Sequence, residues 1–283
     1  MTEYLLNAQI KDHLIFKGLT DVMKTQIDEL TFYITDEGIK VYCIPSEKVY
    51  IYSLIPRNSF KNFEFKENTY LTIPTGILSD IIKTTNKREE MSFIIREDDP
   101  NVLDICFHDI EDNRTKNYKL VLPSNTSRPP NLSDMNHDYT LNIPSKTFQQ
   151  IVKELKVLNE SFCIGKDKEG LFFSSANGNL AVRTYFNLDD VPTIETEKSN
   201  DDSGVHAEYD KEKDTWHVQK NNKEQSDEEK EEQLFGKYSI KTFTNIIKAS
   251  CISDMVKMHI GSSPTVLEYI IGDVGVLRFI VFS

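Results

Sequence analysis

Apolar residues recur at spacings of three and four at four places along this chain. Each time the pattern closes on two apolar residues followed by lysine, in the stretches 19–24, 78–83, 148–153 and 243–248. This spacing predicts four short helices, each with one buried face. Sequence typical of β-strands follows every one of them. A unit of helix plus strands that is used four times indicates a chain built by internal repetition.

The second and third units agree over a longer stretch. Ile73-Pro74-Thr75 and Ile143-Pro144-Ser145 lie 70 residues apart, and so do the helix ends that follow them. Proline suits the first turn of a helix, because its missing N–H has no helical partner there. We expect Thr75 and Ser145 to help cap the open amides of the two helices.

Two strand pairs are predicted to be tight hairpins. Residues 30–34 and 39–43 flank an acidic residue followed by Gly38, and residues 161–173 repeat the arrangement around Gly170. An acidic residue plus glycine between two apolar runs is a typical hairpin turn.

The strands after the second and fourth helices, Met91–Ile95 and Met255–Ile260, should each pair through a turn that contains proline, Pro100 or Pro264. These patterns predict an α+β fold with two topologically similar domains, each made of two helix-plus-strands units and antiparallel sheets.

The domain boundary is predicted from composition. Residues 123–138 are rich in Pro, Ser and Asn and read as an extended linker. We therefore expect an N-terminal domain at 1–122 and a C-terminal domain at 139–283.

Acidic residues are concentrated in one part of the second domain. Residues 193–232 hold 14 acidic and 6 basic residues, a net charge of −8 in a chain whose net charge is −12. Such a segment is too polar to pack, so we expect mobile insertions at about 193–214 and 220–233. Thr215–Gln219 alternates between them like a strand. An acidic interaction arm and an inconsequential solvated insertion both remain open.

The sequence offers no catalytic constellation. It has no glycine-rich run before Lys-Ser/Thr, no serine in a nucleophile elbow, and six scattered histidines without metal-ligand spacing. We expect no enzyme activity, no catalytic residue, no metal and no cofactor. Cys43, Cys106, Cys163 and Cys251 are far apart and are expected to be four buried thiols. No apolar run is long enough for a transmembrane helix or a secretory signal.

The C-terminal run Pro264–Phe279 contains a proline, then Leu-Glu-Tyr, then Ile-Gly-Asp-Val-Gly-Val-Leu and Arg-Phe. Shorter stretches at Gly38–Ile51, Asn117–Leu120 and Gly178–Leu180 accompany it. In these residues the chain resembles the eukaryotic and archaeal sliding clamps, the proliferating cell nuclear antigen (PCNA) family. The resemblance covers nearly the whole chain apart from the acidic insertions.

This resemblance implies a DNA polymerase processivity factor that acts in DNA replication and repair. It implies a homotrimeric ring with helices around the hole and sheets outside, which encircles double-stranded DNA without reading its sequence. The implied partners are DNA polymerase, other proteins with a clamp-binding motif and a clamp loader. The implied location is the nucleus, or a cytoplasmic viral replication site. A subunit of a heterotrimeric checkpoint-type clamp and a monomeric or dimeric viral processivity factor remain as alternatives.

The resemblance also implies residues that bind DNA. Lysines of the four helices would face the phosphates: Lys11, Lys17, Lys24, Lys83, Lys87, Lys153, Lys156, Lys241 and Lys248. A lysine in the last helical turn also favours the helix dipole wherever it points, so each has a purely structural explanation too. The family often has adjacent lysines where this chain has His13-Leu14.

Two more surfaces are implied. Exposed sheet edges would join the subunits through Tyr118, Leu120, Leu122, Leu180, Val182 and Tyr185. A peptide pocket for partners would consist of Ile44, Val49, Ile51, Pro130, Leu132, Pro264, Ile280, Val281 and Phe282. Pro45 and Lys48 depart from the family pattern beside this pocket, which predicts a difference in partner specificity.

Overall fold

The computed structural model describes residues 3–123, 137–178, 180–186, 205–210, 215–218, 232–261, 264–272 and 275–283. The chain forms two compact units. Unit 1 consists of Met1–Asn131 and Ile270–Arg278, and unit 2 of Leu132–Tyr269 and Phe279–Ser283. The sequence prediction did not include the late segment Ile270–Arg278 in the first unit.

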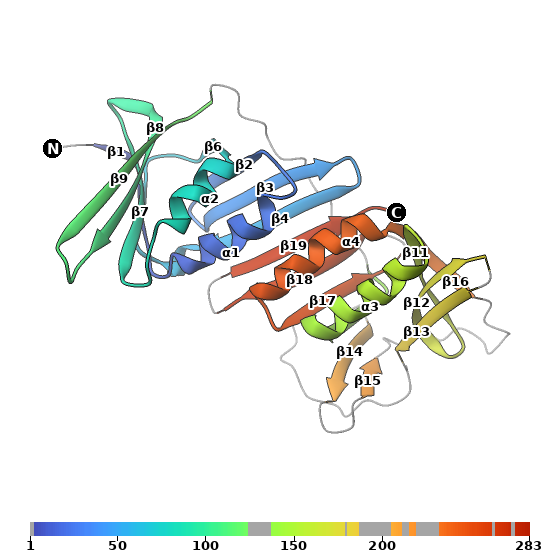
Figure 1. Ribbon diagram of the computed structural model, residues 1–283. Coiled ribbons are helices and arrows are strands. Elements are labelled where there is room, and N and C mark those ends of the chain that lie inside the picture. Colours follow the sequence, from blue (N-terminus) through green and yellow to red (C-terminus); the bar gives the residue numbers. More distant parts are fainter. Residues whose placement is uncertain are drawn as a thin grey trace. The chain divides into compact units, whose positions relative to one another are not determined.

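Unit 1 is drawn in blue to green in Figure 1. Its elements are β1 (Tyr4–Ile10), α1 (Leu14–Met23), β2 (Glu29–Thr35), β3 (Gly38–Ser46), β4 (Val49–Pro56), the 3-10 turn η1 (Arg57–Ser59), β5 (Phe60–Phe65), β6 (Thr69–Pro74), α2 (Thr75–Lys83), β7 (Glu89–Arg96), β8 (Asp99–Asp109) and β9 (Arg114–Val121). One antiparallel sheet has the order β5-β1-β7-β8-β9, and the other contains β4-β3-β2-β6. Residues Gly275–Arg278 lie beside β4, where Ser53 Oγ donates to Val276 O at 2.8 Å.

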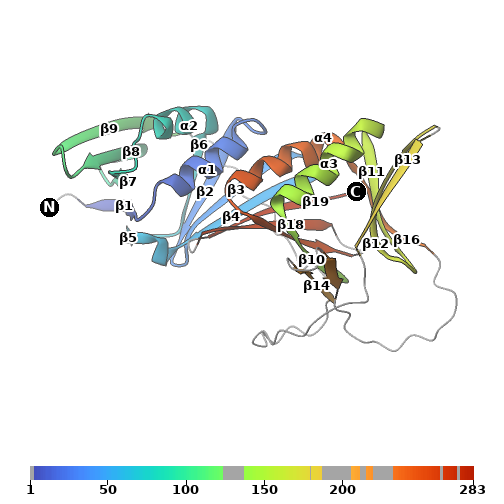
Figure 2. The same ribbon diagram turned by 60° about the horizontal axis from the view of Figure 1, so that its bottom comes forward.

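Helices α1 and α2 lie next to each other and cover one side of the unit 1 strands (Figures 1 and 2). Phe16 of α1 meets Phe93 of β7 edge to face, with ring centroids 5.1 Å apart, and Phe32 of β2 lies 5.9 Å from Phe93. All three rings are buried. The apolar side of the helix thus packs against the buried sides of strands from both sheets.

Unit 2 repeats the plan. Its elements are β10 (Tyr139–Pro144), α3 (Ser145–Leu158), β11 (Ser161–Asp167), β12 (Gly170–Asn177), β13 (Leu180–Phe186), β14 (Val205–Asp210), β15 (Thr215–Val218), β16 (Gln233–Ser239), α4 (Ile240–Ile246), the 3-10 turn η2 (Ile247–Cys251), β17 (Met255–Ile260), β18 (Thr265–Ile271) and β19 (Gly275–Val281). One sheet has the order β13-β12-β11-β16, and β10 lies between β14 and β17 in the other. Phe162 and Phe243 meet edge to face at 4.7 Å in its core.

The predicted helices and hairpins are confirmed. The four periodic stretches lie in α1, α2, α3 and α4 with η2, and the two tight hairpins are β2–β3 and β11–β12. Gly38 has φ 135° and Gly170 has φ 141°. A Cβ at Gly38 would lie 2.2 Å from Ile55 O, so only glycine fits this turn.

Three of the four helices start with the same main-chain contact. The backbone N–H of the first helical residue donates to the carbonyl of an acidic residue just before a strand: Thr75 to Asp28 at 2.8 Å, Ser145 to Asp254 at 2.7 Å, and Ile240 to Glu160 at 2.9 Å. The repeat seen in the sequence is therefore also a repeat of hydrogen bonding. It ties each of these helices to a strand distant in the sequence.

The expected capping by Thr75 and Ser145 is wrong. Pro74 and Pro144 occupy the cap positions, and neither helix has a side-chain cap. Both hydroxyls are buried without a hydrogen-bond partner among the described residues. The main-chain contact already satisfies the first amide, so the hydroxyl side chains pack into the core instead.

Two further expectations are corrected. Pro100 is the second residue of β8 and not part of the turn before it, in a stretch where the β7–β8 register shifts. Proline is tolerated there because the ladder is already irregular. Of the four cysteines only Cys43 is buried, and Cys251 is exposed.

The predicted strand Thr215–Gln219 is present as β15, whereas β14 (Val205–Asp210) lies inside the first predicted insertion and was not expected. The other residues of both insertions lie outside the described part of the chain. Within the described part, no helix combines the length and hydrophobicity that crossing a bilayer requires.

Candidate functional site

Three of the predicted lysines of unit 1 are bound to nearby acceptors. Lys24, just after α1, pairs with Asp21 at 2.5 Å, and Lys83, the last residue of α2, pairs with Asp80 at 3.2 Å. The hydrogen bond to Asp21 raises the pKa of Lys24, which therefore keeps its charge. Lys11 donates from Nζ to Asn58 O at 2.7 Å. Exposed ion pairs of this kind contribute about 0–1 kcal/mol, so a phosphate can exchange for the carboxylate.

Lys17 is half-buried on α1, and Lys87 is exposed in the turn after α2. His13 is 4% exposed and is the N-cap residue of α1, which begins at Leu14. Burial lowers its pKa, so it stays neutral near pH 7. His13 is thus a core residue and adds no charge to this face.

The lysines of unit 2 are exposed on two adjacent helices. Lys153 and Lys156 lie on α3, Lys241 on α4 and Lys248 in η2. Lys248 donates to the neutral amide oxygen of Asn245 at 3.1 Å, so that contact does not cancel its charge.

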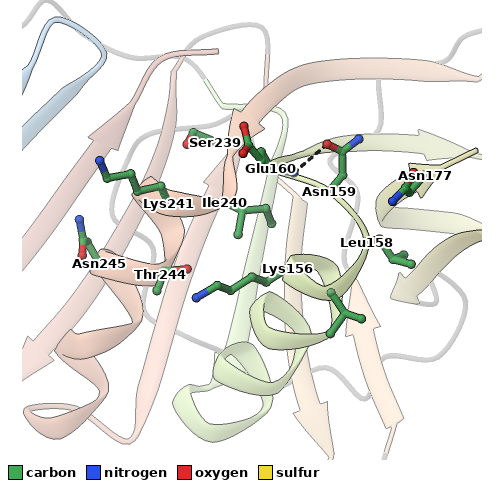
Figure 3. Close-up of a pocket in the computed structure, with 11 residues that line it drawn as sticks. Lys156, Leu158, Asn159, Glu160, Asn177, Ser239, Ile240, Lys241, Thr244 and Asn245 are labelled. Atoms are coloured by element: carbon green, nitrogen blue, oxygen red, sulfur yellow. Dashed lines mark hydrogen bonds between the residues drawn. The ribbon is translucent and has the colours of Figure 1, made fainter.

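A hollow of about 710 Å³ opens between the end of α3 and the start of α4. Figure 3 shows Lys156 extending across it towards Thr244, while Lys241 and Asn245 point outwards from α4. Asn159, Asn177 and Ser239 complete its polar lining, with Glu160 as a carboxylate. Two ammonium groups among neutral amide and hydroxyl groups suit a polyanion. The described residues contain no cluster able to ligate a metal ion.

No pattern in the sequence singles out the neutral residues of this hollow. Asn159 is held by donation from Glu160 N to its Oδ1 at 2.7 Å, and from its Nδ2 to Ala176 O at 2.9 Å. Asn and Thr are common in loops and helix ends, so only the fold shows that these residues line one surface.

Strand β9 is one edge of its sheet in unit 1. Val121 is 72% exposed there, whereas the predicted Leu120 is buried in the core of the unit. Tyr118 and Leu122 are half-buried, and the Tyr118 hydroxyl lies 3.0 Å from Thr84 Oγ1. The edge strand is therefore linked to the end of α2, and its outward apolar side chain is one that the sequence prediction missed.

Strand β13 is the corresponding edge in unit 2. Leu180 is 61% exposed, and Val182 and Tyr185 are half-buried. Arg183 lies 4.0 Å over the Phe172 ring and pairs with Asp167 at 3.0 Å. Among the described residues, β13 pairs with β12 alone, so its other side is a sheet edge. Such an edge, with an exposed leucine, is open to pairing with another chain.

The predicted peptide-pocket residues differ in exposure. In unit 1, Ile44 is 49% exposed, whereas Val49 and Ile51 are buried. In unit 2, Ile280 and Val281 are buried, and Pro264 and Phe282 are half-buried. The two linker residues, Pro130 and Leu132, lie outside the described residues. Ile44 is thus the member of the set most accessible to a ligand.

Comparison with known proteins gives matches in both parts of the chain. The family model described as "Proliferating cell nuclear antigen, N-terminal domain" matches residues 5–126, and its counterpart for the C-terminal domain matches residues 131–202. Together the two models cover more than half of the chain.

Full-length relatives show the same pattern. The proliferating cell nuclear antigen of Chaetomium thermophilum is 24% identical over 281 residues, covering 97% of this chain and 96% of that protein. The Dictyostelium discoideum protein of the same name is 21% identical over 281 residues, covering 97% of each. The probable DNA polymerase sliding clamp 1 of Paramecium bursaria Chlorella virus 1 is 20% identical over 269 residues, covering 94% and 92%.

Proposed function

Since the chain belongs to the PCNA family, we propose that it is a DNA sliding clamp, a ring that encircles duplex DNA and holds a DNA polymerase on it. The observation that carries this proposal is the repetition of one helix start, by which Thr75, Ser145 and Ile240 donate to strand-end carbonyls. Repeated units of one shape are what a closed ring needs.

Ring closure follows from the internal repeat. In unit 1 the strand after the first hairpin, β4, has Gly275–Arg278 of β19 beside it. Its counterpart in unit 2 is β13, and the counterpart of β19 is β9. We infer that β9 of one copy pairs with β13 of the next, and that three copies close a homotrimer. The exposed Val121 and Leu180 would then be covered.

DNA binding rests on the lysines of the four helices. A chain of net charge −12 is repelled by DNA as a whole, so the hold must be topological and assisted by local positive charge. Contacts from Lys153, Lys156, Lys241 and Lys248 to phosphates carry no sequence information, which allows the ring to slide.

Partner docking would use Ile44 and its predicted companions, with a short partner peptide inserting apolar anchors. The proposed partners are a DNA polymerase, further proteins with clamp-binding motifs and a clamp loader. The proposed place of action is the nucleus, or a viral replication site in the cytoplasm.

A closed ring stays on DNA because it encircles the duplex, and this property distinguishes a clamp from a protein that simply binds DNA. The protein should be loaded onto a nicked circular plasmid with a clamp loader and then passed over a gel-filtration column at high salt. We expect it to stay with the circular DNA and to be lost when a restriction enzyme linearises the plasmid. Equal retention on circular and linear DNA would reject the ring.

A further inference from the structure

Two histidine rings of unit 2 lie next to each other. His259 is in β17, and His137 comes just before β10, the strand that pairs with β17. Their ring centroids are 5.3 Å apart, and the rings are tilted by 41°. Since a Zn–N bond is about 2.0–2.1 Å long, two imidazoles bound to one tetrahedral ion have ring centres about 5 Å apart. The observed spacing therefore suits a shared metal ion.

Each ring has a hydrogen bond that fixes its orientation. His137 Nε2 lies 3.2 Å from the carbonyl oxygen of Pro264, which can only accept, so Nε2 donates and Nδ1 carries the lone pair. His259 Nδ1 lies 2.9 Å from Thr140 Oγ1, and when this hydroxyl accepts, Nε2 carries the lone pair. Histidines that bind a metal ion usually donate their second ring nitrogen in this way, to a carbonyl or another acceptor.

His259 and Thr140 project from the outer side of the sheet. Val256, Met258 and Ile260 of β17 are buried in the core, and His259 alternates with them. Thr140 is opposite His259 in the β10–β17 ladder and therefore shares its side. No group of three metal ligands occurs among the described side chains, so a third ligand has to come from elsewhere on this side.

The strand order brings a third histidine to the same place. β14 pairs with β10 in parallel, and His206 is opposite Thr140 in that ladder. Thr140 thus separates the backbone positions of His206 and His259. Because neighbouring strands are about 4.8 Å apart, the Cα atoms of these two histidines are about 10 Å apart. An ion bonded to Nε2 lies about 6 Å from the Cα of its histidine, so these positions allow one ion to be shared above Thr140.

The charge of the surroundings favours a cation. β14, drawn in orange in Figure 1, belongs to the segment 193–232, whose net charge is −8. The ligand type favours one class of cation, because imidazole nitrogens suit Zn²⁺, whereas Mg²⁺ and Ca²⁺ prefer oxygen ligands. Three histidines and one water molecule make a common tetrahedral zinc site.

We propose that His137, His206 and His259 bind one Zn²⁺ ion on the outer side of the β14-β10-β17 strands. The ion ties β14, which lies inside the first predicted insertion, to the two core strands. No spacing in the sequence indicates this site, because only the strand order brings the three histidines together. The inference goes beyond the proposed function, since it requires neither DNA nor ring closure.

The test titrates Zn²⁺ into the full chain, prepared without a histidine tag and stripped of metal by a chelator. Isothermal titration calorimetry at about pH 7.5, where histidine is mostly neutral, should show one ion per chain. We expect a Kd of about 1 µM or tighter and a melting temperature that rises with Zn²⁺, because the ion binds the folded chain. A stoichiometry other than one ion per chain, or equal affinity for Mg²⁺, would overturn the proposal.

Single substitutions locate the ion. His137→Gln, His206→Gln and His259→Gln should each weaken Zn²⁺ binding at least about tenfold, because one of three Zn–N bonds is lost. Unchanged affinity in His206→Gln would show that β14 supplies no ligand and would reject the site. If another of these variants fails to fold, the His206 variant decides.

Two controls separate this site from other zinc-binding groups. His108→Gln is matched to His259→Gln, because His108 Nδ1 also lies close to a threonine hydroxyl, 3.1 Å from Thr115 Oγ1, on a sheet of unit 1. Cys251→Ser removes an exposed thiol. Both variants should bind Zn²⁺ as tightly as the native chain, and a tenfold loss in either would contradict the assignment.

Discussion

Single residues determine how much positive charge the helices present. Lys24 and Lys83 are paired with carboxylates of their own helices, whereas Lys248 donates to the neutral amide of Asn245. Lys241 lies in α4 of unit 2, and Lys248 lies in the 3-10 turn η2 that follows it. These contacts thus differ between the units, with carboxylates accepting from Lys24 and Lys83 and a neutral amide accepting from Lys248.

Charge reversal of two lysines tests DNA contact. Lys241→Glu with Lys248→Glu should abolish stimulation of a DNA polymerase on a primed template, because two phosphate contacts become repulsive. The oligomer should remain intact by light scattering. Lys66→Glu with Lys168→Glu, an equal charge change at two exposed positions between strands, should leave stimulation unchanged. Unchanged stimulation in the first variant would remove these lysines from the DNA site.

Ile44 tests the peptide pocket. Because its side chain is 49% exposed, Ile44→Asp should fold normally. We expect this variant to bind a fluorescent clamp-binding peptide at least about tenfold more weakly, since an apolar anchor would meet a carboxylate. Ile77→Asp is the matched control, because Ile77 is also 49% exposed but lies on α2, away from the predicted pocket residues in the sequence. Equal affinity in the Ile44 variant would contradict the pocket.

His13 should make stability depend on pH. Burial lowers the pKa of His13 below the value of about 6.5 that is usual for histidine, so below about pH 6.5 the unfolded chain binds more protons than the folded one. Stability is therefore present at pH 7 and is lost as the pH falls. His137, whose pKa burial also lowers, acts in the same direction.

The measurement is the melting temperature between pH 7 and 5.5, above the range in which carboxylates titrate. It should fall with pH in the native chain and fall less in His13→Gln. Parallel curves would show that His13 is not the titrating group.

At the scale of elements, sequence periodicity was sufficient to place the helices and hairpins, because burial of one face fixes the spacing of apolar residues. It did not show how the helices begin. The carbonyls of Asp28, Asp254 and Glu160 lie far from their helices in the sequence, so only the fold brings them there. For the same reason Thr75 and Ser145 were mistaken for caps.

Edge strands show a similar limit. The resemblance named Leu120, but the twist and register of β9 turn Leu120 into the core and leave Val121 outside. In β13 the named Leu180 is exposed. Alternation along a strand is visible in the sequence, whereas the side that faces the core is clear only where hydrophobicity differs strongly between the two sides.

The exposed edge strand β13 is the proposed contact between copies, so a single substitution there should disrupt the oligomer. Leu180→Asp should convert the oligomer to monomers, because a carboxylate would be buried against the next copy. Ile110→Asp is a closely matched control, since Ile110 is also 61% exposed but lies in the turn after β8. Sedimentation velocity distinguishes the two. An intact oligomer in Leu180→Asp, or its loss in the control, would contradict pairing through β13.

At the scale of the whole molecule, the number of copies of the chain decides whether a ring can close. The chain has two units of one topology, whereas a ring of six domains needs six. The other four must therefore come from two further copies of the chain. The acidic residues at 193–232 hold most of the net charge of −12 and lie apart in sequence from the four lysine-bearing helices. The proposed DNA contact of these helices therefore does not require the net charge of the whole chain to be positive.

The native mass tests this account most directly. Light scattering coupled to gel filtration at micromolar concentration should give about three times the 32.7 kDa of one chain. A single species at 32.7 kDa that does not grow with concentration would contradict ring closure and, with it, the proposed sliding clamp.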